Sequence, residues 1–167
     1  FFTEEFQSTG LLISRGKTLH DYQKGQLING IFLLNKNHQP KLIPADQDLP
    51  TNPDFAIQNG PILLDDHSDI MVDEKLNKSA SRTAIGIDKD NHIIVIFLRQ
   101  SLLNRDNTLT LLEFARILAN SDYFRKIGLH SVLNLDGGTS TGLAIGDEYF
   151  PELAKVQNII ITKPQSS

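Results

Sequence analysis

The sequence predicts an α+β domain in which many short β-strands form a mixed sheet around one main helix. Short apolar runs separated by glycine, proline and asparagine recur along the chain, which is typical of strands joined by tight turns. A convincing helical spacing of apolar residues occurs once, over residues 110–120. The 167 residues suffice for a substantial core, so we expect residues 1–167 to form a single domain.

The composition is that of a globular protein, with 40% hydrophobic and 22% charged residues. A formal net charge of −4 and the lack of a basic run exclude a general attraction to nucleic acid. No apolar run has the length of a transmembrane segment. The chain contains no cysteine, which excludes disulfides and thiolate chemistry. The oligomeric state is left open.

The first part of the chain consists of strand-like runs divided by turn residues. The predicted strands are residues 10–16 with a hairpin partner in 17–22, then 26–34, 40–43 and 55–64. The last of these is broken at Gln58-Asn59-Gly60-Pro61. Residues 45–54 contain two prolines and are predicted to form a loop or a short helical turn.

The middle of the chain changes from a polar excursion to two strands. Residues 65–79 are predicted to lie on the surface. Their acidic cluster at 65–69 offers metal ligands, but its spacing fits no standard calcium loop, which favours a solvated turn. Residues 81–88 alternate with a period of two, and the continuous apolar run 92–98 predicts a fully buried strand.

The main helix begins with Thr110-Leu-Leu-Glu113, the pattern of a capping box. Its spacing predicts a buried face. The residues expected on that face are Leu111, Phe114, Ala115 and Leu118. A short second helix is predicted over residues 122–127, ending at Gly128. Strands are then predicted at 131–135, 143–145 and 156–162.

The strand at 131–135 is followed at once by Asp136, two glycines and three hydroxyl residues. Gly137 and Gly138 can adopt a positive φ and allow close approach to the backbone. Successive free N–H groups in such a turn form a concavity that suits an anion. An ordinary tight turn with Asp-Gly chemistry is the alternative.

A resemblance to a known family rests on three segments, which occur along the chain in this order: Gln58-Asn-Gly-Pro61, Ser81-Arg-Thr-Ala-Ile-Gly86 and Asn134-Leu-Asp-Gly-Gly-Thr-Ser140. With the helix between the second and third segments, the chain resembles the phosphodiester glycosidase family. The third motif of that family is close to Asn-Leu-Asp-Gly-Gly-Gly-Ser-Ser, so Thr139 and Thr141 are departures from it. The first motif, Asn-(Gly/Ala)-Gly-Phe-Phe, survives only as Phe1-Phe2, and we expect the domain to lack the rest of it.

The resemblance implies a hydrolase that cleaves, or transfers at, a sugar-1-phosphodiester glycosidic bond. It further implies a carbohydrate or sugar-phosphate substrate on an envelope or extracellular glycan, and a periplasmic or secreted protein. One alternative is a non-catalytic envelope module that binds phosphorylated glycans, and another is a structural domain of a larger envelope protein. No cofactor is assigned, although a divalent cation such as calcium is left open.

The resemblance makes Asp136 and Arg82 the expected catalytic residues. A guanidinium can bind phosphate bidentately, and a carboxylate can stabilise an oxocarbenium-like centre. The alternatives are an arginine paired with an aspartate and a turn aspartate that accepts backbone N–H groups. No second carboxylate stands out beside Asp136. The expected substrate-binding residues, converging on one cleft, are Gln58, Asn59, Gly60, Thr83, Asn134, Gly137, Gly138, Thr139 and Ser140. The amides among them alternatively cap exposed backbone.

Overall fold

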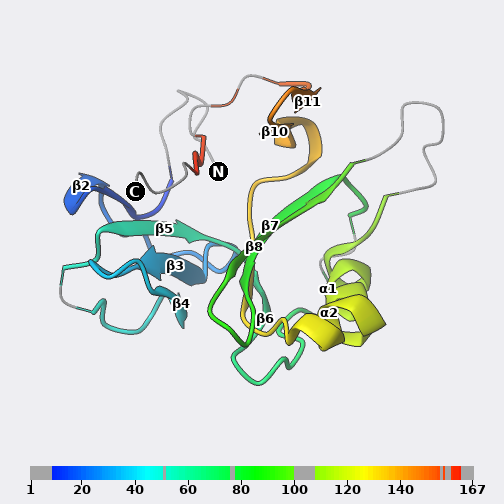
Figure 1. Ribbon diagram of the computed structural model, residues 1–167, viewed down its shortest axis with the longest axis horizontal. Helices are drawn as coiled ribbons and strands as arrows, with labels where there is room; N and C mark the ends of the chain where they lie inside the picture. The colour runs from blue at the N-terminus through cyan, green and yellow to red at the C-terminus, as the bar shows by residue number, and fades with distance from the viewer. Residues whose placement is uncertain are drawn as a thin grey trace.

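The computed structural model describes residues 9–50, 52–75, 78–99, 108–154, 156 and 159–162. In this part of the chain the strands form a five-stranded sheet, a four-stranded sheet and a hairpin (Figure 1). The five-stranded sheet has the order β2-β1-β5-β3-β4 and contains β1 (Leu12–Ser14), β2 (Lys17–His20), β3 (Gly30–Leu34), β4 (Pro40–Pro44) and β5 (Phe55–Asn59).

The four-stranded sheet has the order β6-β9-β7-β8 and contains β6 (Ile62–Leu64), β7 (Arg82–Ile87), β8 (Ile93–Leu98) and β9 (Val132–Asn134). The hairpin pairs β10 (Leu143–Ile145) with β11 (Glu148–Phe150). The predominance of short strands and the single main helix are confirmed. The predicted mixed sheet around that helix is wrong, because every strand pair described is antiparallel and the helices cover one outer face.

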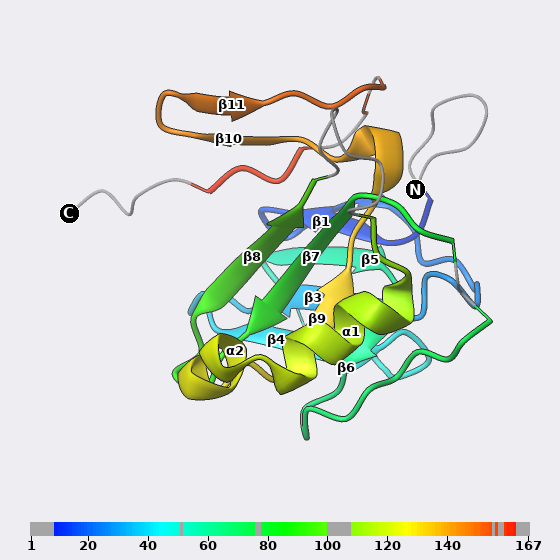
Figure 2. The same ribbon diagram turned by 90° about the vertical axis from the view of Figure 1, so that its right-hand side faces the viewer.

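The two sheets pack face to face around a shared apolar layer. Phe32 of β3 belongs to one apolar cluster with Ile85 and Leu133 of the other sheet, and Ile57 of β5 packs against this cluster. The opposite face of the four-stranded sheet packs against α1 (Leu111–Asn120), and α2 (Asp122–Ile127) follows it (Figure 2). Alternate residues of the central strand β7 therefore point either toward the five-stranded sheet or toward α1.

The helix predictions are confirmed in detail. Thr110 accepts the N–H of Glu113, and the Glu113 carboxylate accepts the N–H of Thr110, which is the reciprocal arrangement of a capping box. The four residues expected on the buried face are buried. The second helix ends at Gly128, whose φ of 68° is left-handed. No helix among the described residues is long and apolar enough to cross a membrane.

Two strand predictions are wrong. The strand at 92–98 exists as β8, but it is an edge strand, and Val95 is 47% exposed. Its continuous apolar run arises because Ile94 and Ile96 pack toward α1 while Val95 and Phe97 line a pocket on the other face. The predicted strand at 156–162 forms no strand in its described residues. Phe1 and Phe2 lie outside the described residues.

The chain passes from the five-stranded to the four-stranded sheet between β5 and β6, and side-chain amides bind the backbone around this crossover. Gln58 is 2% exposed. Its Oε1 accepts the N–H groups of Leu11 (2.9 Å) and Gln23 (3.1 Å), and its Nε2 donates to the carbonyls of Gln23 (2.6 Å) and Ile28 (2.9 Å). One amide thus satisfies four backbone groups.

Two asparagines bind the crossover itself. Asn29 Oδ1 accepts the N–H of Ile62 at 2.9 Å, and Asn134 Nδ2 donates to the carbonyl of Gly60 at 2.9 Å. A Cβ on Gly60 would lie 2.8 Å from the carbonyl oxygen of Leu27, so a larger residue cannot take this path without displacing the backbone. The Gln-Asn-Gly-Pro segment therefore has a structural role at this point.

Replacement of Gln58 tests that role. Gln58→Leu keeps the volume but leaves four backbone groups without a partner. We expect the free energy of unfolding to fall by at least about 3 kcal/mol, because each buried group left unsatisfied costs roughly 1–3 kcal/mol. Urea denaturation followed by circular dichroism measures this, with the exposed Gln47→Leu as control. Equal stability of the two variants would contradict the structural role.

Candidate functional site

A pocket of about 580 Å³ opens beside the layer between the two sheets. It is bounded by the end of β5, by β7 and β8, by the chain that follows β9, and by the β10–β11 hairpin with residues 159–162. Figure 2 shows the hairpin beyond the end of β8, separate from both sheets. The pocket therefore lies where the edge strand β8 extends past the cover of the five-stranded sheet.

Five of the residues predicted for the site line this pocket: Gln58, Asn59, Thr83, Asp136 and Ser140. Arg82, Gly60, Asn134, Gly137, Gly138 and Thr139 do not line it. The expected convergence of all these residues on one cleft is therefore not what the structure shows. Two features help to keep these six residues out of the lining. Side chains alternate between the two faces of the strand that contains Arg82 and Thr83, and residues 138–140 form a compact turn.

Asp136 follows the last paired residues of β9 and is half-buried. Its Oδ1 accepts the N–H of Gly137 at 2.9 Å, as the turn interpretation predicts. The side chain also lines the pocket, as a site role requires. The two interpretations are compatible, because one oxygen of a carboxylate can fix the turn while the group keeps further acceptor capacity.

The glycine turn does not present a row of free N–H groups. The N–H of Gly138 donates to the carbonyl of Ser81 at 2.9 Å, and the N–H groups of Ser140 and Thr141 donate back within the turn. With the N–H of Gly137 bound to Asp136, these amides are occupied. The predicted anion-binding concavity is wrong, because residues 138–140 form a 3₁₀ turn that uses its own amides.

Arg82 points away from the pocket. It shares a face of β7 with Ala84, which packs in the core beneath α1, whereas Thr83 faces the pocket. Its Nε donates to the carbonyl of Leu109 at 3.0 Å, and its Nη2 donates to the carbonyl of Lys78. Burial lowers the pKa of Arg82, and no carboxylate of the described residues forms an ion pair with it.

The other predicted residues outside the lining hold the backbone in place. Asn134 pairs in register with Ala84 and so lies on the α1 face; its Nδ2 binds the crossover, while its Oδ1 is buried without a partner among the described residues. The carbonyl of Thr139 accepts the N–H groups of Leu153 (2.8 Å) and Ala154 (3.0 Å). Thr139 therefore anchors the segment after the hairpin.

That segment carries a pocket residue that the sequence did not indicate, Glu152. Glu152 follows no apolar strand and belongs to no motif, so the sequence gives no reason to choose it. The structure places it at the pocket because the Thr139 carbonyl binds the N–H groups of the next two residues. The hydroxyl of Tyr149 donates to Glu152 Oε2 at 3.2 Å, and this bond raises the pKa of Tyr149. Asp136 and Glu152 are the charged residues in the described lining, which contains no lysine, arginine or histidine.

Two threonines of the pocket lining have hydroxyl oxygens that are buried from solvent. Thr83 Oγ1 and Thr9 Oγ1 are buried, and neither has a hydrogen-bond partner among the residues that the structure describes. Buried polar groups in folded proteins are nearly always hydrogen-bonded, so these two oxygens are exceptions within the described residues. Thr83 lines the pocket with other atoms, and its contact with substrate stays a prediction.

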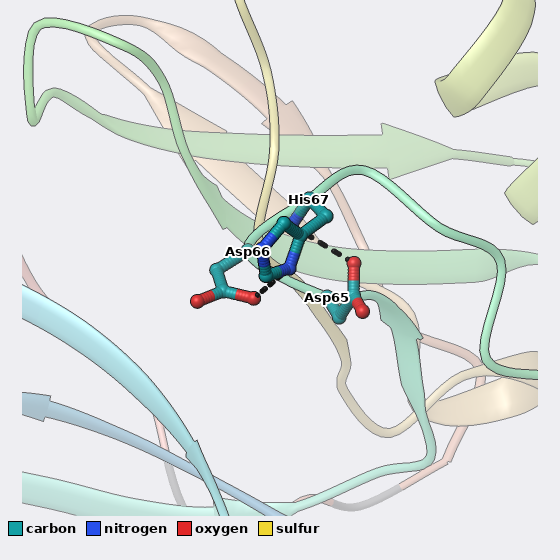
Figure 3. A group of neighbouring side chains, drawn as sticks. All are labelled: Asp65, Asp66 and His67. Atoms are coloured by element: carbon teal, nitrogen blue, oxygen red, sulfur yellow. Dashed lines mark hydrogen bonds and ion pairs between the residues drawn. The ribbon is translucent and has the colours of Figure 1, made fainter.

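The acidic cluster at 65–69 does not line the pocket, and Figure 3 shows three of its residues, Asp65, Asp66 and His67. Asp65 Oδ1 accepts the N–H groups of His67 and Asp69, both at 2.9 Å. Asp66 Oδ1 lies 2.7 Å from His67 Nδ1, with both side chains exposed. A second group, Asp88 with Asp90 and His92, similarly closes the β7–β8 turn. The first group is a solvated turn, whereas the Asp88 carboxylate of the second group is buried beneath its turn.

Two solved structures are similar in fold. The alignment with the catalytic domain of zebrafish N-acetylglucosamine-1-phosphodiester alpha-N-acetylglucosaminidase, auto-inhibited by its pro-peptide, has 21% identity and a TM-score of 0.63 and covers 85% of this chain and 50% of that one. A hypothetical protein from Synechocystis aligns with 18% identity and a TM-score of 0.54, over 90% of this chain and 47% of that one. The chain thus spans about half the length of either structure.

No curated protein matches the chain. A family model described as phosphodiester glycosidase, however, matches residues 1–166. This match covers nearly the whole sequence, including the three segments on which the resemblance rests. The chain therefore belongs to the phosphodiester glycosidase family.

Proposed function

We propose that this protein hydrolyses the glycosidic bond of a sugar-1-phosphodiester and that the pocket beside Asp136 is its active site. The family supports the reaction type. The zebrafish protein of similar fold is named for cleavage of such a bond, next to N-acetylglucosamine. By the same resemblance, the proposed place of action is the cell envelope or its exterior.

The observation that carries the proposal is the charge of the pocket. Its described lining holds the carboxylates of Asp136 and Glu152 and no cationic side chain. Glycoside cleavage passes through an oxocarbenium-like transition state with positive charge at the anomeric carbon. Fixed negative groups stabilise such a charge most strongly in a partly desolvated site. The pocket therefore suits the sugar ring, and the anionic phosphate lies outside it.

The roles of the pocket residues follow from this orientation. Asp136, positioned by its bond to Gly137, stabilises the developing positive centre. Glu152 is the second carboxylate and activates the attacking water as a general base. Phosphate is a good leaving group, so strong proton donation to it is unnecessary. Ser140 and Thr83, which line the pocket, contact the sugar.

Asp136→Asn tests the central role. Asparagine tolerates the same turn and keeps an acceptor for Gly137, so the melting temperature should stay unchanged. Turnover of a chromogenic sugar-1-phosphodiester should fall roughly a hundredfold, as for the loss of one electrostatic contact to a transition state. Asp147→Asn, in the exposed hairpin turn, serves as the matched control.

Wild-type turnover by Asp136→Asn would refute the catalytic role of this carboxylate. A parent protein that binds phosphorylated glycans tightly without cleaving any sugar-1-phosphodiester would favour the non-catalytic envelope module instead.

Glu152→Gln tests the general base. The exchange keeps shape and hydrogen bonding to Tyr149 but removes the basic oxygen, and general-base catalysis contributes typically about 10²–10⁴-fold. We expect kcat to fall within that range with little change in KM, and Tyr149→Phe to have a much smaller effect. Added azide, a nucleophile that needs no base, should restore turnover of Glu152→Gln. An unchanged kcat in Glu152→Gln would exclude the role.

Arg82 is the residue for which binding and folding roles must be separated. Its predicted contact with the departing phosphate stays a prediction, while its bonds to Lys78 and Leu109 give it a positioning role beside the glycine turn. If Arg82 has this positioning role, Arg82→Ala should lower the free energy of unfolding by about 1–3 kcal/mol, because two carbonyls lose their donor. Arg82→Lys restores only part of this, since an ammonium lacks the planar fork.

Chemical denaturation of both variants, beside the exposed Arg116→Ala as control, decides between the roles. A large loss of kcat with undiminished stability would instead favour direct contact with phosphate.

A further inference from the structure

The pocket is built mainly from aliphatic and aromatic side chains. Ile85, Val95 and Phe97 form the side on the four-stranded sheet, and Ile145 and Tyr149 belong to the opposing hairpin. Phe97 also contacts Phe150 of the hairpin, with ring centroids 5.8 Å apart. Its volume of about 580 Å³ lies within the roughly 300–1,000 Å³ typical of small-molecule sites.

Several apolar side chains in the lining are unusually exposed, although Leu11, Ile85 and Leu135 are buried. Val95 is 47% exposed, Ile145 65% and Ile161 71%. Such a concentration of exposed apolar groups around one cavity is typical of a binding site for an apolar ligand. A sugar alone, with polar hydroxyl groups around its ring, leaves most of this surface without a suitable partner.

The polar groups of the lining restrict the head group of that ligand. The carboxylates of Asp136 and Glu152 repel an anion, and no basic residue of the described lining offsets them. The two carboxylates and the hydroxyl of Ser140 can instead hydrogen-bond the hydroxyls of a neutral sugar. Charge complementarity therefore favours an uncharged glycoside over an anionic amphiphile of the same chain length.

We propose that the pocket binds an amphiphile with an uncharged sugar head and a hydrocarbon chain. In the substrate, the sugar that is released from phosphate carries an acyl or alkyl chain. The binding of the amphiphile does not depend on the proposed function, whereas the statement about the substrate rests on it. With the sugar beside Asp136 and its chain against Val95 and Phe97, the phosphate faces outward, away from the carboxylates.

Isothermal titration with alkyl glucosides, below their critical micelle concentrations, tests the binding statement. Octyl glucoside should bind, and hexyl glucoside should bind more weakly by about fourfold per methylene, the gain expected for burying one CH₂ group. Methyl glucoside should bind at least a hundredfold more weakly than octyl glucoside. Octyl sulfate should bind at least tenfold more weakly than octyl glucoside, and Asp136→Asn should narrow that difference.

Two variants locate the chain. Val95→Asp, at a half-exposed position that tolerates a charge, should weaken octyl glucoside binding at least tenfold, and Ile145→Asp should do the same from the hairpin side. Leu19→Asp on β2, exposed to a similar degree but outside the lining, should leave binding unchanged. The proposal would be overturned if all three variants changed the affinity for octyl glucoside equally. It would also be overturned if octyl sulfate bound as tightly as octyl glucoside.

Turnover separates this proposal from the proposed function. If both hold, a sugar-1-phosphodiester whose sugar bears an octanoyl chain has a KM at least tenfold below that of its unacylated counterpart. Octyl glucoside binding without turnover of any phosphodiester would refute the proposed function and leave the binding statement supported. Turnover with the same KM for both substrates would overturn the inference on the substrate and leave the proposed function intact.

Discussion

The arrangement of the two sheets depends on how the chain crosses between them at Gln58-Asn59-Gly60-Pro61. At this point the backbone leaves one hydrogen-bond ladder before it joins the next, so its polar groups need other partners. Asn29 and Asn134 supply partners to Ile62 and Gly60, and the Gln58 amide binds the neighbouring backbone of Leu11, Gln23 and Ile28. The crossover is therefore secured by side-chain amides, and the apolar layer between the sheets forms around it.

The position of the pocket follows from the same arrangement. The five-stranded sheet covers β7 and β9 but leaves the inner face of the edge strand β8 partly open. Because β9 ends beside this opening, the residue after it, Asp136, is delivered to the pocket wall. The occupied amides of the glycine turn then fix the start of the hairpin, and Thr139 anchors the segment of Glu152. Both carboxylates thus depend on one short turn.

Local patterns in the sequence predicted local structure well. The capping box at Thr110 and the apolar spacing after it predicted α1 and its buried face, because both depend on residues within two turns. Asp136, Thr83 and Ser140 could be predicted as pocket residues because strand ends carry polar groups to the rim of a core. The alternation in β7 already places Arg82 on the face opposite Thr83, but its partners, the carbonyls of Lys78 and Leu109, have no local pattern. Glu152 depends on distant contacts and has no local pattern.

The central claim is that ligand binds on the pocket face of β7 and not on the face that holds Arg82. The most direct measurement is a titration of isotope-labelled protein with a methyl-esterified hexose 1-phosphate, followed by amide chemical shifts. The account predicts the largest shifts at Thr83, Asp136, Ser140 and Glu152. Largest shifts at Lys78, Arg82 and Leu109, with the pocket residues unmoved, would contradict it.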